Sequence, residues 1–255
     1  MFEDSSDFHD YYCTRQGRHV AMRLRRTVGD FWSRAPNACN VAIGYPPPVL
    51  RTEERPPVLS FMPMRLGPRP WPPKGPNRSA LVNGRLLPLQ NVQLDRLLLV
   101  HALEFDPSPS CLLDECWRVL DGAGRLLVMV PNRNGLWARA EKTPFGHGRP
   151  FSRGQLRKLL ADHGFKPVRA QTALFMPPAA LGLFLRFGPQ IERIGSNWSP
   201  GIGGVLVVEA EKNLYAPAGK TSRVTSRASV AAGKLAPRPS GSISTGFMAE
   251  GAEGS

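Results

Sequence analysis

The most informative hydrophobic pattern lies in the middle of the chain, where two short apolar runs do not alternate with polar residues. These runs span residues 97–100 and 126–130. Strands that are covered on both faces show this pattern, whereas strands with one solvent-exposed face alternate. The two runs therefore predict neighbouring strands of a parallel sheet, joined by whatever structure lies between them.

The segment between the two runs has the pattern of an amphipathic helix. Ser108 is placed to act as N-cap, and Pro109 fits the first helical position, where a missing N–H is harmless. Gly122 and Gly124 are expected to end the helix. One apolar stripe runs along it, formed by Leu112, Leu113, Cys116, Trp117 and Leu120. The whole stretch predicts a βαβ unit with a right-handed crossover.

Before this unit the pattern predicts one amphipathic helix over residues 8–33 and then a series of short strands. The strands are expected at residues 40–45, 58–62 and 79–82. Eleven prolines lie between Pro46 and Pro76. Long helices are excluded there, and about two helical turns are expected over residues 49–55.

After the unit, helical and strand patterns continue to alternate. A helical turn is expected at residues 136–141, and Ser152 with Gln155 forms a capping box that opens the next helix. A strand, a helix and a last strand follow at residues 165–175, 179–194 and 203–210. We expect residues 1–213 to form one domain. Residues 214–255 are rich in Ser, Ala, Gly and Pro, which predicts a disordered basic tail.

Composition and charge add little to this picture. The chain has 255 residues, of which 42% are hydrophobic, and this suffices for one core plus a tail. Its formal net charge of +13 favours an acidic protein or RNA as a partner. The arginines are scattered along the chain, however, which favours a merely basic soluble protein. RNA binding rests on charge alone, because no recognition motif with interleaved aromatic residues is present.

The four cysteines and the N-terminus bear on compartment and metal binding. No two cysteines have zinc-finger spacing, so no metal site is expected. The N-terminus is acidic and lacks the basic-then-apolar form of a signal peptide, and no apolar run has the length of a membrane span. These features predict a cytoplasmic protein with reduced thiols.

Three segments, in order, resemble motifs of the class I S-adenosylmethionine-dependent methyltransferases that act on small molecules. The first runs over residues 87–104 and ends in His-Ala-Leu-Glu, the second runs over residues 115–126 and contains Arg-Val-Leu, and the third runs over residues 145–156. The similarity covers roughly residues 8–213. It implies a single α/β domain with an N-terminal helix. Its sheet would be the centre of a three-layer Rossmann-like fold, mostly parallel with an antiparallel last strand.

The resemblance also implies where ligands bind, because open α/β sheets hold them at the carboxyl ends of their strands. It places S-adenosylmethionine against six residues, Gly44, Tyr45, Met62, Asn83, Gly84 and His101. Asn132 and His147 are expected to contact the substrate. No catalytic residue is assigned, since methyl transfer needs chiefly alignment, with a base where the acceptor carries a proton. Glu104 is either such a base or a carboxylate that leads into a helix.

The front half of the chain departs from the family pattern. Gly44 is followed by Tyr45 and three prolines where the family has a glycine-rich loop, and Met62-Pro63 stands where the family has an acid. Proline removes backbone donors and adds bulk where amides should face the cofactor. Two functions remain open. One is a methyltransferase for a small-molecule or unknown acceptor, and the other is a catalytically impaired methyltransferase-like binding or regulatory protein.

Overall fold

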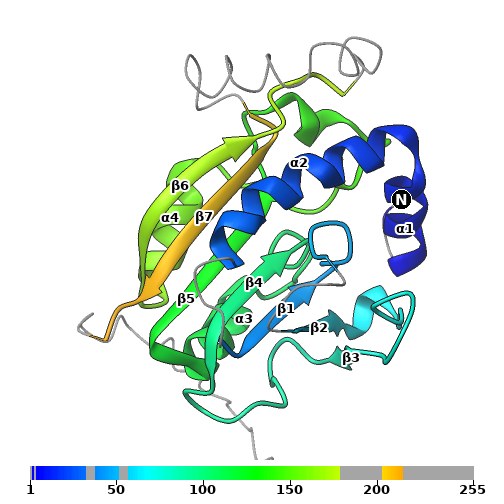
Figure 1. The fold of residues 1–255 in the computed structure, drawn as a ribbon. Helices are drawn as coiled ribbons and strands as arrows, with labels where there is room; N and C mark the ends of the chain where they lie inside the picture. Colours follow the sequence, from blue (N-terminus) through cyan, green and yellow to red (C-terminus); the bar gives the residue numbers. More distant parts are fainter. Residues whose placement is uncertain (1, 3, 33–37, 52–56, 179–202, 215–255) are drawn as a thin grey trace, which may run out of the picture. The chain divides into compact units, whose positions relative to one another are not determined.

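The computed structural model describes residues 2, 4–32, 38–51, 57–178 and 203–214. Within these ranges the strands form one seven-stranded sheet in the order β3-β2-β1-β4-β5-β7-β6 (Figure 1). The strands are β1 (Asn40–Gly44), β2 (Val58–Pro63), β3 (Ser79–Val82), β4 (Leu94–Val100), β5 (Leu120–Pro131), β6 (Phe165–Ala173) and β7 (Val205–Lys212). All the expected strands within the described ranges are present, and their bounds shift by a few residues.

Strand pairing has the predicted directions. β3, β2, β1, β4 and β5 pair in parallel, with Gly44 opposite Val100 and Leu99 opposite Val128. β7 lies between β5 and β6 and pairs antiparallel with both. The mostly parallel sheet with an antiparallel last strand is therefore confirmed.

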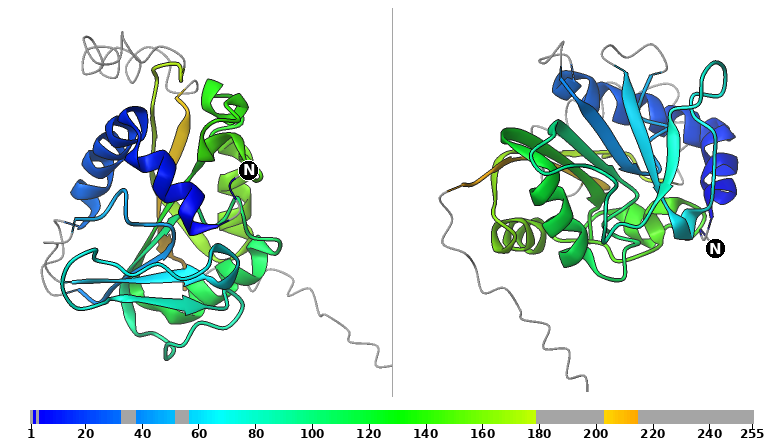
Figure 2. Two further views of the ribbon diagram at one scale, coloured as in Figure 1. Left: turned by 90° about the vertical axis from the view of Figure 1, so that its right-hand side faces the viewer. Right: turned by 90° about the horizontal axis from the view of Figure 1, so that it is seen from below.

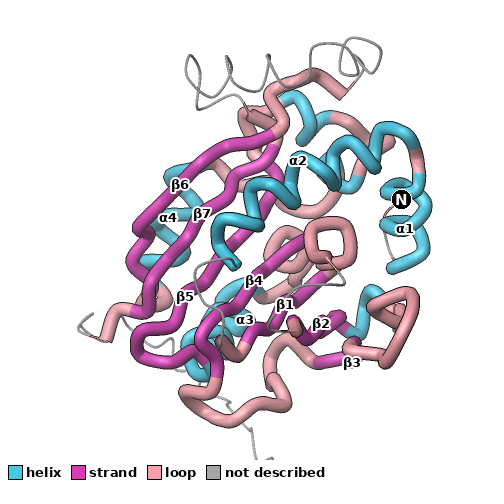
Figure 3. The backbone as a smooth tube through the Cα atoms, viewed as in Figure 1, coloured by secondary structure: helices cyan, strands magenta, loops and turns pink. Residues whose placement is uncertain are grey.

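Helices cover both faces of this sheet, as Figures 2 and 3 show. The helices are α1 (Ser5–Cys13), α2 (Arg15–Trp32), α3 (Pro109–Val119) and α4 (Arg153–Asp162), with 3-10 turns η1 (Met64–Leu66), η2 (Leu136–Arg139) and η3 (Pro144–Gly146). One buried cluster joins α1 and α2 to the sheet, and a second joins α3 and α4 to its other face. The expected three layers are therefore present.

The central βαβ unit is confirmed, and its helix begins at Pro109 with Ser108 in the N-cap position, as expected, but it ends earlier than expected. The Ser108 side chain does not cap α3; its hydroxyl accepts a hydrogen bond from Arg85 at 2.9 Å. α3 ends at Val119, because Leu120 adopts an extended backbone and pairs with Leu94 in the sheet. The prediction that Gly122 and Gly124 end the helix was therefore wrong: both lie within β5.

The single helix expected over residues 8–33 is also wrong, because the chain breaks at Thr14 into α1 and α2. Thr14 has an extended backbone; its hydroxyl donates to the Tyr11 carbonyl at 2.6 Å and accepts from the Gly17 amide at 3.0 Å. A Cβ atom on Gly17 would lie 2.0 Å from the Tyr11 carbonyl oxygen. Glycine thus lets the start of α2 pass close to the end of α1.

The remaining segments agree in part. The capping box of Ser152 and Gln155 is confirmed at the start of α4. Of the two helical turns expected at residues 49–55, residues 52–55 lie outside the described residues, and the described part shows one turn, in which the Pro46 carbonyl accepts from Val49 and Leu50. The helix at residues 179–194 and the tail from residue 215 lie outside the described residues. No described helix has the length and apolar character of a membrane span.

Candidate active site

The carboxyl ends of β1 and β4 lie side by side at one edge of the sheet. Gly44 pairs with Val100, and the amide of Tyr45 donates a hydrogen bond to the Val100 carbonyl at 2.7 Å. His101 follows Val100 directly. Open α/β sheets bind ligands at this edge, where the strand order reverses direction. The fold therefore brings Gly44, Tyr45 and His101 together, as the sequence predicts.

Gly44 is required by the close approach of these two strand ends. Its φ of +105° lies in the region that favours glycine. A Cβ atom would lie 2.0 Å from the Val100 carbonyl oxygen and 2.9 Å from the Cβ of Ala102. Gly44 therefore lets β1 end against β4, and in this arrangement its missing side chain makes room for protein backbone.

His101 sits in a buried chain of three hydrogen-bonded side chains. Its Nδ1 lies 3.1 Å from Oε1 of Glu104, and its Nε2 lies 2.7 Å from the hydroxyl of Tyr12. His101 is 3% exposed and Glu104 is 2% exposed. His101 also has a positive φ of 49°, an uncommon conformation for a residue with a side chain. In this uncommon backbone conformation the His101 imidazole points toward Tyr12 of α1.

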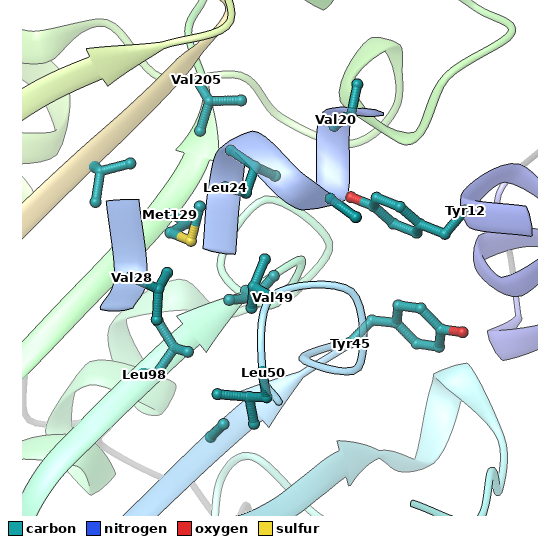
Figure 4. Packing of buried hydrophobic residues seen from close by; sticks show 14 of the residues in the cluster. Tyr12, Val20, Leu24, Val28, Tyr45, Val49, Leu50, Leu98, Met129 and Val205 are labelled. Carbon is teal, nitrogen blue, oxygen red and sulfur yellow. The ribbon is translucent and has the colours of Figure 1, made fainter. Parts of the chain in front are cut away.

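Aromatic rings close over this chain from several parts of the sequence. The Phe8 ring centroid lies 5.1 Å from His101 and 5.1 Å from Tyr45, and Phe105 lies 6.4 Å from His101. Tyr45 stacks on Tyr12 with centroids 6.3 Å apart, and Figure 4 shows these two side chains between α1 and the end of β1. We call Phe8, Tyr12, Tyr45 and Phe105 the aromatic cover. Burial raises the pKa of Tyr12 well above its usual value and that of Tyr45 to about 12, so both are neutral phenols at neutral pH.

A small cavity of about 10 Å³, room for roughly one water molecule, lies beside His101, at the ends of β4 and β5 and the start of β7. Its wall is mostly apolar and includes Leu24, Met129, Phe145 and Val205, whereas its polar side chains are His101 and Glu104. Oε2 of Glu104 is buried and has no hydrogen-bond partner among the described residues. The cavity therefore combines an apolar wall with one unsatisfied hydrogen-bond acceptor.

The other predicted cofactor residues lie farther along the same edge. Met62 is buried in β2, next to β1, and pairs with Leu81. Asn83 and Gly84 form the turn after β3, and β3 is separated from β1, which ends at Gly44, by β2. The Asn83 side chain accepts a hydrogen bond from the Arg85 amide at 3.0 Å. Contact between these residues and a cofactor stays a prediction.

The two predicted substrate residues hold loops in the structure. Asn132 is buried, donates to the Gly203 carbonyl at 2.6 Å and accepts from the Asn134 amide at 3.2 Å. His147 is hydrogen-bonded to the Glu141 carbonyl at 2.7 Å. Their contact with a substrate also stays a prediction.

Three side chains of the aromatic cover, Phe8, Tyr12 and Phe105, were not assigned from the sequence, and the role of Glu104 was left open. The signals present in the sequence were the aromatic group over residues 8–12 and the spacing of His101 and Glu104. In the part of the chain that the structure describes, no three His, Cys, Asp or Glu side chains group as metal ligands would.

Comparisons with known proteins link the chain to methyltransferases through one partial sequence match and through similar folds. No family model matches the chain. A Mycobacterium tuberculosis protein named probable S-adenosylmethionine-dependent methyltransferase is 32% identical over 123 residues, which cover 45% of this chain and 44% of that protein. The chain thus matches less than half the length of this curated relative.

Solved structures of methyltransferases share the fold over most of the chain. One is a Thermotoga maritima methyltransferase described as a possible histamine N-methyltransferase, with a TM-score of 0.57, 19% identity and coverage of 82% of this chain and 95% of that one. Another comes from Archaeoglobus fulgidus, with a TM-score of 0.52, 18% identity and coverage of 80% and 97%. The chain therefore has the fold of the class I S-adenosylmethionine-dependent methyltransferases and resembles a member of this family in sequence over part of its length.

Proposed function

We propose that the protein is an S-adenosylmethionine-dependent methyltransferase that acts on a small molecule. The convergence of Gly44 and His101 at the carboxyl edge of a sheet with this strand order carries the proposal. The similarity to the mycobacterial protein supports it, because it is a similarity of sequence as well as fold. All four cysteines are unpaired, which suits a reducing compartment, so we place the activity in the cytoplasm.

The cofactor does not fit the residues at this edge in the arrangement that the structure describes. Tyr45 is buried and its amide is bonded to Val100, so it does not face a ligand. β2 ends at Pro63, which offers no carboxylate to ribose hydroxyls. The cavity of about 10 Å³ is far smaller than the roughly 300 Å³ or more of typical ligand sites.

Helix α1 carries two rings of the aromatic cover and has to move before the cofactor enters. Phe8 and Tyr12 belong to α1, and they hold it on the sheet edge through ring contacts and the Tyr12–His101 hydrogen bond. Undocking of α1 removes both rings and leaves the strands paired. The proposal therefore includes an open state in which α1 has left the edge.

Binding of S-adenosylhomocysteine to the full chain tests the proposal. Calorimetric titration is expected to give saturable heat for one site per chain, with a dissociation constant between about 1 μM and 1 mM. The variant Phe8→Ala is expected to bind more tightly, because it favours the open state. Absence of saturable heat with both proteins would contradict the proposal.

A second function is favoured by the closed edge itself. A methyltransferase-like protein that binds no cofactor does not require an open site at this sheet edge. The buried rings of the aromatic cover would then stabilise the closed structure permanently. Such a protein would serve as a binding or regulatory module. The same titration separates the two, since this module gives no saturable heat even when Phe8 is removed.

A further inference from the structure

Tyr12, His101 and Glu104 form a hydrogen-bonded chain that packing alone does not require. Tyr12 lies 89 residues before His101 in the sequence, and all three side chains are titratable and buried. Burying polar groups is unfavourable unless they are paired, so such chains are usually fully satisfied. This one is not, because Oε2 of Glu104 lacks a partner among the described residues.

One tautomer of His101 satisfies both of its hydrogen bonds. In that tautomer Nδ1 carries the proton and donates it to Oε1 of Glu104. Nε2 then presents its lone pair to the Tyr12 hydroxyl 2.7 Å away, and the hydroxyl donates. His101 is thus oriented as a base toward the oxygen of a phenol.

The cavity next to this pair has room for about one water molecule in the closed structure, and the position of the Tyr12 ring adds space beside His101 when α1 opens. It is lined by His101 and Glu104 on one side and by apolar side chains such as Leu24 and Met129 on the other. The Phe145 ring lies 5.2 Å from His101 and extends the aromatic wall. A small molecule with an aromatic body and a hydrogen-bond donor matches these surroundings.

We propose that His101, held by Glu104, binds and deprotonates the hydroxyl of a small phenolic methyl acceptor. The Tyr12 hydroxyl occupies the place of that hydroxyl in the closed structure. When α1 opens, the acceptor takes this place. Its O–H bond breaks, the proton passes to Nε2 of His101, and the bonding electrons remain on the phenolate oxygen. This inference deepens the proposed function and rests on it, but acceptor binding itself involves no cofactor.

The test uses 4-nitrophenol as the probe, because its anion absorbs visible light and its neutral form does not. The full-chain wild type is titrated beside Tyr12→Ala, which removes the competing hydroxyl, and Tyr11→Ala as matched control. Tyr11 is a buried phenol on the same helix whose hydroxyl has no partner among the described residues. Tyr12→Leu keeps an apolar side chain and replaces the alanine variant if that one does not remain folded.

Tyr12→Ala is expected to bind 4-nitrophenol at least about tenfold more tightly than wild type, since one hydrogen bond no longer competes. Tyr11→Ala also removes a buried ring from α1 but keeps the Tyr12 hydroxyl, so it is expected to gain much less affinity than Tyr12→Ala. The ether 4-nitroanisole, which has no proton to give, is expected to gain clearly less affinity from Tyr12→Ala than the phenol does. Equal binding of the ether and the phenol to Tyr12→Ala would overturn the proposal, because it would show cavity filling only.

The ionisation of the bound probe tests the role of the base. At a pH at which free 4-nitrophenol is mostly neutral, the probe bound to Tyr12→Ala is expected to show the anion spectrum. Adding Glu104→Gln is expected to abolish this spectrum, since an amide does not hold the imidazolium. Arg65 donates a hydrogen bond to the Phe105 carbonyl at 2.9 Å. If a cation such as Arg65 were the cause of the anion spectrum, removing the Glu104 charge would strengthen that spectrum, and this result would overturn the proposal.

None of these measurements contains S-adenosylmethionine or its product. A positive phenol result with no binding of S-adenosylhomocysteine would reject the transferase and keep the phenol site. Cofactor binding without hydroxyl-dependent phenol binding would keep the transferase and reject His101 as the base.

Discussion

Replacing Gly44 with alanine is expected to destabilise the fold by more than about 2 kcal/mol. The φ of Gly44 is strained for any residue with a side chain, and the new Cβ atom would lie 2.0 Å from the Val100 carbonyl oxygen. β1 would therefore have to separate from β4 where the Tyr45 amide donates to that oxygen. Urea unfolding followed by circular dichroism measures the loss.

Gly29→Ala is the matched control for this substitution. Gly29 lies inside α2, and a Cβ atom there meets no atom within 4 Å. Alanine is a better helix former, so the control is expected to stabilise the protein by up to about 1 kcal/mol. An unchanged unfolding midpoint for Gly44→Ala would show that β1 does not end against β4 as described.

Phe8→Ala is expected to change stability and cofactor binding in opposite directions. Phe8 is fully buried against Tyr45 and His101, and removing a buried phenylalanine costs about 3–5 kcal/mol. The loss of stability cannot exceed the free energy that docks α1 on the sheet, because α1 can undock while the sheet remains folded. A protein that spends more time open binds S-adenosylhomocysteine more tightly, in proportion to the populated open fraction. Urea unfolding and calorimetry together measure both effects.

Phe165→Ala separates an opened site from a merely weakened protein. Phe165 is buried in the cluster on the opposite face, with α3 and α4. It is expected to lose a similar amount of stability, about 3–5 kcal/mol, without any gain in affinity for S-adenosylhomocysteine. Equal gains in the two variants would contradict the role of α1 as the cover.

Sequence patterns predicted the sheet well because a strand that is buried on both faces consists of a continuous apolar run. The runs at residues 97–100 and 126–130 predicted β4 and β5, and the helix between them predicted their parallel pairing. The break at Thr14 was missed, because it depends on the close approach of Gly17 to Tyr11 in three dimensions. The end of α3 was missed because Leu120 pairs with Leu94 in the sheet, and the local apolar pattern does not show this pairing.

The site was only partly predictable for a similar reason. His101 follows the central strand, so its position at the sheet edge follows from topology. Its partner Tyr12 is 89 residues away, and no local pattern predicts which helix crosses that edge. The closed mouth was also missed, because a sequence gives no measure of how four aromatic side chains pack. The proposed domain of residues 1–213 stays a prediction.

The central claim is that the carboxyl edge of β1 and β4, beneath α1, is the cofactor site. Amide hydrogen exchange read by mass spectrometry, with and without S-adenosylhomocysteine, tests it region by region. We predict slower exchange at the end of β1, residues 40–45, together with faster exchange in α1, residues 5–13, as that helix leaves the edge. Unchanged exchange in both regions at saturating ligand, with protection elsewhere in the chain, would contradict the claim.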